Sequence, residues 1–147
     1  MINTKIYKAV YELAEKLMKA AAKDDRASFD ALYAELKALC VANEDSEKDH
    51  PEQWETLADF TEALDEALLI YQKALDKAVE KASKDHIASI GFSMATLQVE
   101  TGQPAAAIQS LQQAKASAQK IEDNDLKAEI DDLLNQLTQG QEPHFDQ

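Results

Sequence analysis

The chain has 147 residues, of which 45% are hydrophobic, with three glycines, three prolines and a formal net charge of -13. This length suffices for one domain with a hydrophobic core, and the scarcity of helix breakers and of β-branched runs favours an all-α fold over a β-rich one. The negative charge repels phosphate backbones and anionic lipid, so we expect no nucleic-acid or membrane partner and favour a basic or neutral protein or peptide partner.

Cys40 is the only cysteine, so the chain cannot form an internal disulfide. It lies beside Leu36 and Leu39 on an apolar helix face, which predicts a buried structural thiol. Residues 1–23 carry charges through their middle, unlike a signal peptide, and no apolar run approaches the length of a membrane span. We therefore expect a cytoplasmic protein.

Two helices are predicted in the first third of the chain, from Thr4 to Lys23 and from Arg26 to Ala42. Asp24 or Asp25 can cap the second helix, and the pair should form an antiparallel hairpin. Each helix has an apolar residue at every third or fourth position. These residues are Ile6, Val10, Leu13, Leu17 and Ala20, then Phe29, Leu32, Leu36, Leu39 and Cys40.

The segment from Asn43 to Asp49 is polar and has no period, which predicts a loop. Asp49 stands three residues before Glu52, with Pro51 in the first turn, and this spacing predicts that Asp49 caps the next helix. The loop is acidic enough to suggest a cation or basic-peptide site. It lacks the glycine and the terminal glutamate of a calcium loop, so we expect no bound metal.

The segment from Pro51 to Lys84 has no glycine and no further proline, and we expect it to form one long helix against which the others pack. Acidic residues fill its first half and lysines its second, as suits the dipole of a single helix. Its apolar seam has a heptad-like spacing. The seam comprises Trp54, Leu57, Thr61, Leu64, Leu68, Tyr71, Leu75, Ala78 and Ala82.

A second set of side chains in this segment is acidic and also recurs at steps of three and four. Such a stripe is either a solvated face or a docking surface for a basic partner or for the lysines of the first helix. Trp54, at the start of the seam, is either a core anchor or an exposed binding hot spot. The acidic stripe comprises Glu52, Glu55, Asp59, Glu62 and Glu66.

Three shorter helices are predicted after Lys84, giving about six helices in one domain over residues 1–140, followed by a flexible tail, 141–147. Asp85 should cap the first of them, and Gly91 within it should make room for a neighbouring backbone. Gly102 and Pro104 mark the next boundary, and Gly140 ends the last helix. Their apolar positions are Ile87, Ile90, Met94 and Leu97, then Ala107, Ile108, Leu111, Ala114, Ala118 and Ile121, and finally Leu126, Ile130, Leu133, Leu134 and Leu137.

The stretch from Ala88 to Gln119 resembles a tetratricopeptide repeat, a helical hairpin of about 34 residues. It departs from the motif at Gly91, Gln98 and Gln119, where tryptophan, tyrosine and proline are usual, and elsewhere in the chain the match is degenerate. The residues that match the small, large and turn positions of the motif are Met94, Ala95, Gly102, Ala107, Leu111 and Ala114.

The resemblance implies a tetratricopeptide-like fold of helical hairpins that binds a peptide or protein segment on the face of the first helix of each hairpin. Phe92 and Val99 on that face could equally pack against the long helix. The residues that the resemblance assigns to binding are Ser89, Phe92, Thr96, Val99 and Glu100.

No catalytic, cofactor-binding or metal-binding pattern is present in the sequence. His50, His86 and His144 are not spaced as a metal cluster, and the chain has no phosphate-binding loop or nucleophile elbow. We therefore expect no enzyme but a small acidic adaptor for protein–protein interaction. The alternatives are a dedicated chaperone that holds a single client, or a structural homodimer. That dimer would form through Tyr71, Leu75, Ala78 and Val79.

Overall fold

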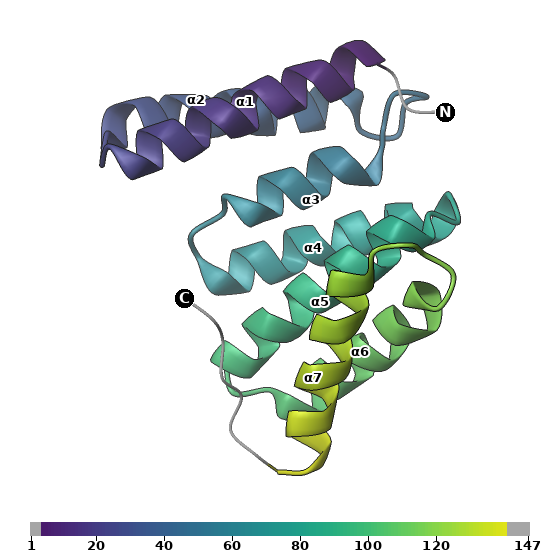
Figure 1. Ribbon diagram of the computed structural model, residues 1–147. Helices are drawn as coiled ribbons and strands as arrows, with labels where there is room; N and C mark the ends of the chain where they lie inside the picture. Colours follow the sequence, from purple (N-terminus) through teal and green to yellow (C-terminus); the bar gives the residue numbers. More distant parts are fainter. Residues whose placement is uncertain (1–3, 141–147) are drawn as a thin grey trace. The chain divides into compact units, whose positions relative to one another are not determined.

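The computed structural model describes residues 4–140, and within that range it contains seven α-helices and no strand (Figure 1). The predicted all-α class is therefore confirmed, with seven helices rather than six in the described range. The predicted flexible tail, 141–147, lies outside the described residues. The helices are α1 (Thr4–Ala22), α2 (Arg26–Asn43), α3 (Pro51–Asp59), α4 (Leu64–Glu80), α5 (Lys84–Glu100), α6 (Pro104–Ala118) and α7 (Asn124–Thr138).

The chain divides into two compact units, residues 1–74 and 75–147, and the division falls within α4. Unit 1 contains α1, α2, α3 and the first part of α4. Unit 2 contains the end of α4 with α5, α6 and α7. The single domain expected over residues 1–140 stays a prediction, and each unit is described by itself below.

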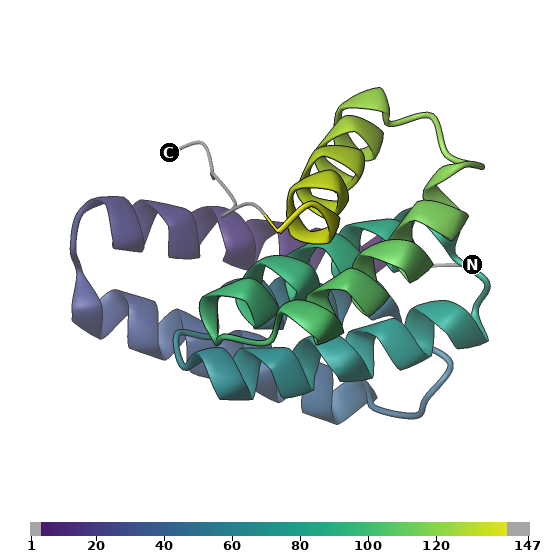
Figure 2. The ribbon, with the colours of Figure 1, turned by 90° about the horizontal axis from the view of Figure 1, so that it is seen from below.

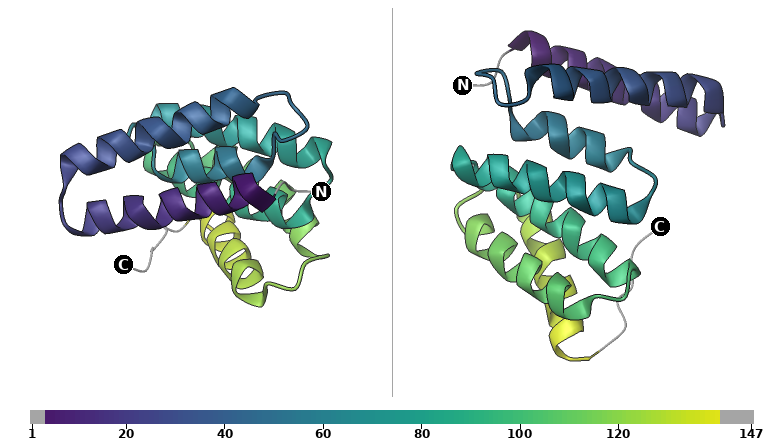
Figure 3. Two further views of the ribbon diagram at one scale, coloured as in Figure 1. Left: turned by 90° about the horizontal axis from the view of Figure 1, so that it is seen from above. Right: turned by 180° about the vertical axis from the view of Figure 1, so that it is seen from behind.

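Unit 1 is built on the predicted α1–α2 hairpin, and α3 packs against both of these helices (Figure 3). Asp25 caps α2, since its carboxylate accepts a hydrogen bond from the Ser28 amide at 3.2 Å. Asp24 takes the left-handed turn position instead, with φ of 55°. The core is formed by Val10, Leu13, Leu17, Ala20, Phe29, Leu36, Cys40, Trp54, Leu57 and Ala58.

The cap of α3 differs from the prediction, because His50 and not Asp49 fills it. The His50 Nδ1 accepts a hydrogen bond from the Glu52 amide at 3.1 Å, and Pro51 occupies the first turn as expected. Asp49 is buried, and its carboxylate accepts from Trp54 Nε1 and from the Asp45 amide, both at 2.7 Å. The hydrogen bond from Trp54 Nε1 to Asp49 holds the buried indole in the core, which confirms Trp54 as a core anchor.

The single long helix expected from Pro51 to Lys84 is wrong, because α3 ends at Asp59 and α4 begins at Leu64. No glycine or proline follows α3. Two residues past its end, the Thr61 hydroxyl donates to the Leu57 carbonyl at 2.8 Å and forms a 2.6 Å hydrogen bond with the Tyr33 hydroxyl of α2. A threonine hydroxyl competes in this way with the backbone pairing of a helix.

The chain reverses direction after this turn. The Tyr71 hydroxyl of α4 donates to the Asp59 carboxylate of α3, and Lys73 Nζ lies 4.2 Å from the centre of the Trp54 ring. Continuing the helix through residues 60–63 would have separated these pairs, so the expected seam is split between two antiparallel segments. At its other end α4 also stops early, at Glu80 rather than Lys84.

Unit 2 is a three-helix arrangement in which α5 and α6 pair closely and α7 contacts both (Figure 2). Gly91 lies where the two helices approach: a β-carbon built there would stand 2.9 Å from the β-carbon of Ala114 and 3.2 Å from the Ser110 carbonyl oxygen. This confirms that Gly91 makes room for a neighbouring backbone. The buried core comprises Ala88, Ala95, Ala107, Leu111, Ala114, Ala118, Ile121, Ile130 and Leu133.

The boundaries in unit 2 largely follow the local signals of the sequence. Gly102 has a φ of 73°, which suits the end of α5, and Pro104 begins α6. Asp123 caps α7 through the Leu126 amide at 3.0 Å. The cap of α5 is Ser83, not Asp85 as predicted, because α4 ends four residues earlier than expected and the chain turns through Ala82, whose φ is 53°.

Candidate binding pocket

The five residues assigned by resemblance all lie on α5, but they are not equally accessible. Ser89, Phe92, Thr96 and Val99 are half-buried, and only Glu100 is exposed. Phe92 and Val99 pack against the core of unit 2, and the Thr96 hydroxyl donates to the Ser93 carbonyl at 2.8 Å. Packing thus accounts for the two apolar members, and binding at this face stays a prediction.

The expected acidic stripe does not form one continuous face, because the break between α3 and α4 divides it. Glu55 is buried and Glu52 half-buried on α3. Asp59 is exposed as a whole residue, but its carboxyl group is largely buried, and this burial raises the pKa of Asp59 to about 6. The hydrogen bond from Tyr71 opposes the rise, and the charges of Glu55 and Glu52 add to it. Glu62 and Glu66 are instead directed to a separate pocket.

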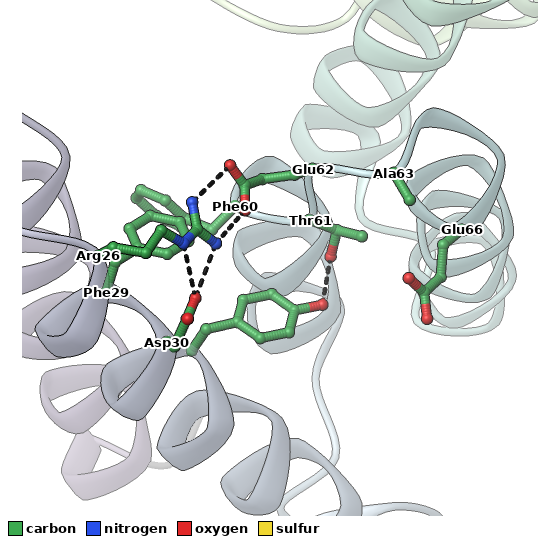
Figure 4. A pocket seen from close by; sticks show the side chains of 9 residues that line it. Arg26, Phe29, Asp30, Phe60, Thr61, Glu62, Ala63 and Glu66 are labelled. Atoms are coloured by element: carbon green, nitrogen blue, oxygen red, sulfur yellow. Dashed lines mark hydrogen bonds and ion pairs between the residues drawn. The ribbon is translucent and has the colours of Figure 1, made fainter. Parts of the chain in front are cut away.

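This pocket lies between the first turns of α2, the 60–63 turn and the start of α4, and it has a volume of about 280 Å³ (Figure 4). We call it the Arg26 pocket. Its wall on α2 consists of residues one helical turn apart, which therefore share a face. Its lining comprises Arg26, Phe29, Asp30 and Tyr33 from α2, Phe60, Thr61, Glu62 and Ala63 from the turn, and Glu66 from α4.

The Arg26 guanidinium bridges carboxylates on both sides of the pocket. Its Nη2 and Nε donate to Asp30 Oδ1 at 2.7 and 3.0 Å, and its Nη1 donates to Glu62 Oε2 at 2.9 Å. Nη2 also contacts Glu62 Oε1. The guanidinium carbon lies 4.9 Å from the centre of the Phe29 ring, within cation–π range.

Aromatic side chains shape the rest of the pocket. Phe29 and Phe60 meet edge to face, with ring centres 6.4 Å apart. Behind them the hydrogen bond between Tyr33 and Thr61 ties α2 to the 60–63 turn. The two walls are therefore joined by an aromatic contact and a hydroxyl pair, in addition to the Arg26 ion pairs.

Carboxylates outnumber cations in the lining. The hydrogen bond from Arg26 lowers the pKa of Glu62, and the bond to Glu62 raises the pKa of Arg26, so both are charged at neutral pH. Asp30 shares the same guanidinium, and Glu66 of α4 also lines the pocket. Three acids thus face a single arginine.

A second, smaller cavity of about 170 Å³ adjoins the Arg26 pocket at the α1–α2 connection. The two cavities share Arg26, Phe29 and Glu62. Asp24 and Asp25 add two further acids to its lining. The Arg26 side chain therefore lies between two open volumes rather than against a filled wall.

The sequence did not lead us to predict this pocket, although the residues of its wall on α2 have a recognisable helical spacing. Arg26, Phe29, Asp30 and Tyr33 stand at positions i, i+3, i+4 and i+7 of a helix that was predicted with the correct start. That spacing places a cation, two aromatic rings and an acid on one face. The opposing wall exists only because the chain turns at residues 60–63.

Cys40 is fully buried, as predicted, and lies away from the pocket lining. Its thiol lies 3.3 Å from the Gln53 carbonyl oxygen. Burial, together with the charge of Asp49, raises the pKa of Cys40 to about 12, so the thiol remains protonated and unreactive at neutral pH.

Comparison of the chain with protein-family models, with curated proteins and with solved structures gave no match. Among the described helices, none combines the length and apolar character needed to cross a membrane.

Proposed function

We propose that the protein is an acidic interaction module that binds a basic segment of a partner protein. The observation that carries this proposal is the Arg26 pocket, where aromatic rings and carboxylates from α2 and the 60–63 turn already hold a guanidinium. Carboxylates recognise cationic side chains through charge-assisted hydrogen bonds, and aromatic faces attract them through their quadrupoles.

The size of the pocket suits one side chain rather than a whole small molecule. Its volume of about 280 Å³ is just below the range of roughly 300–1,000 Å³ for small-molecule sites. The net charge of -13 would steer a basic segment toward the chain and disfavour an acidic one. The proposed module is therefore a binding protein rather than an enzyme, and we place it in the cytoplasm.

The tetratricopeptide-like adaptor remains part of this proposal. The close approach of α5 and α6 at Gly91 is compatible with such a hairpin. Ser89, Thr96 and Glu100 would then supply polar contacts to a bound segment, while Phe92 and Val99 would hold the helix in place.

A dedicated chaperone is the second candidate, and α1 supplies the observation that favours it. Tyr7, Tyr11 and Met18 are exposed, and their spacing places them on one face of the helix. Exposed apolar side chains grouped in this way can hold an unfolded client. The homodimer has less support, because Tyr71, Leu75 and Ala78 are buried and only Val79 of the four proposed residues is exposed.

An array of arginine-rich, lysine-rich, neutral and acidic peptides tests the proposal when it is probed with the intact chain at low and at high salt. We expect the basic peptides alone to bind, and their binding to weaken as salt screens the charges. Suppression of the aggregation of a denatured protein, without peptide binding, would favour the chaperone. Absence of basic-peptide binding at low salt would contradict the interaction module.

A further inference from the structure

We propose that the Arg26 pocket is a guanidinium site, in which Arg26 acts as an internal ligand that an arginine side chain of the partner segment replaces. This inference rests on the proposed function and names the chemical group that the site selects.

The contacts of Arg26 are those that an incoming arginine would make. The planar guanidinium of Arg26 donates to Asp30 on α2 and to Glu62 on the 60–63 turn, while its central carbon lies over the Phe29 ring. These three groups come from two separate elements, so the geometry is that of a small receptor rather than of a pair within one helix.

Exchange at this site does not require the protein to unfold. The side chains of Arg26, Asp30 and Glu62 are 58%, 61% and 61% exposed, and ion pairs so open to water are weak and easily rearranged. Asp25 continues to cap α2 through the Ser28 amide. The Arg26 side chain can therefore turn to solvent while the first turn of α2 stays in place.

Withdrawal of Arg26 would also open a larger site. The cavities of about 280 and 170 Å³ both border on its side chain, as well as on Phe29 and Glu62. Without the guanidinium between them they become one groove, which runs from the α1–α2 connection to Glu66. An incoming side chain would enter this groove with its apolar stem along Phe29 and Phe60.

The arrangement favours guanidinium over ammonium. Asp30 accepts from Nε and Nη2 and Glu62 from Nη1 and Nη2, so a planar fork with five donors can reach both carboxylates while its central carbon lies over the Phe29 ring. An ammonium is a compact charge and meets one carboxylate at a time. Phosphate and other anions are repelled by Asp30, Glu62 and Glu66.

The test is an NMR titration of the full chain with N-acetyl-arginine amide and with N-acetyl-lysine amide. If the open site is populated in about a tenth of the molecules, Arg26→Ala should bind the arginine compound about tenfold more tightly than the wild type, because apparent affinity scales with that fraction. The lysine compound should gain less. Adding Glu62→Gln to Arg26→Ala should remove the gain.

Lys23→Ala is the matched control, since it removes one exposed cation near the α1–α2 connection that does not line the pocket. Circular dichroism checks that each variant is folded, and Arg26→Met, which keeps an apolar stem, replaces Arg26→Ala if the latter is not. The inference is overturned if the Arg26 variant binds the arginine compound no more tightly than Lys23→Ala does, or if the two compounds bind equally.

The outcomes separate this inference from the proposed function. Basic peptides that bind the wild type with chemical-shift changes outside the Arg26 pocket would keep the interaction module and reject the guanidinium site. Tight binding of the arginine compound by the Arg26 variant, without binding of any peptide, would keep the site and reject the module.

Discussion

Replacing Gly91 with alanine should destabilise the protein, although the same change within an exposed helix would stabilise it. Alanine is favoured over glycine within a helix by about 1 kcal/mol. At Gly91 the new β-carbon would stand 2.9 Å from that of Ala114 and 3.2 Å from the Ser110 carbonyl oxygen. Neither neighbour has a rotamer that could move it away.

The magnitude follows from the shift that the helices must make. Carbon atoms pack best at about 3.5 Å or more, so α5 and α6 must separate locally by roughly 0.6 Å. That separation loosens the fully buried contacts of Ala88, Ala95 and Leu111. Overpacking of this kind costs about 1–3 kcal/mol. After the helix-propensity gain of about 1 kcal/mol is subtracted, we expect Gly91→Ala to lower the free energy of unfolding by up to about 2 kcal/mol.

Urea unfolding followed by circular dichroism measures the change, and hydrogen exchange of the α5 and α6 amides locates it. Ala114→Gly is the companion variant, because it removes the atom nearest to the new methyl group. The double variant should therefore be more stable than the sum of the two single changes predicts. A Gly91→Ala protein that is more stable than the wild type by about 1 kcal/mol, as expected for an exposed helical site, would refute the close approach of α5 and α6.

Two further predictions concern unit 1. Trp54→Phe should lower the free energy of unfolding by about 1–3 kcal/mol, because Asp49, only 4% exposed, would lose the indole donor; an unchanged urea midpoint would contradict this. Asp59→Asn tests the raised pKa of Asp59, about 6, against about 3.9 for an unfolded aspartate. Because the folded protein then binds the proton more tightly, the wild type should gain stability relative to Asp59→Asn as the pH falls from 7 toward 4, and the change should begin near the folded pKa of about 6 and be complete near the unfolded pKa of about 3.9. A difference in stability between the two proteins that does not vary with pH would reject the raised value.

Local signals were sufficient wherever a helix boundary depends on its own neighbours. Asp25, Pro51, Gly102 and Pro104 stand at the predicted ends of helices. Gly91 likewise predicted a close helix pair, because a glycine within a helix has a cost that only packing offsets. The hairpins of α1 with α2 and of α5 with α6 followed from these positions.

Prediction failed where a polar side chain formed a hydrogen bond with another side chain that the local pattern did not reveal. Asp49 has the spacing of a helix cap, but the Trp54 indole takes its carboxylate, and His50 caps α3 instead. Thr61 shows no breaker signal, and its partner Tyr33 lies 28 residues earlier. The Arg26 pocket was not predicted for the same reason, because one of its walls forms only where α3 ends and the chain turns at residues 60–63.

The 60–63 turn also bears on the order in which the chain can fold. Before α2 is in place, the segment from Pro51 to Glu80 lacks the Tyr33 hydroxyl, and its own apolar and charge patterns favour one uninterrupted helix. Local preference and final topology thus conflict in this segment, and such frustration is resolved only by a long-range contact. We therefore expect the chain to reverse at residues 60–63 only once α2 is in place to supply the Tyr33 hydroxyl.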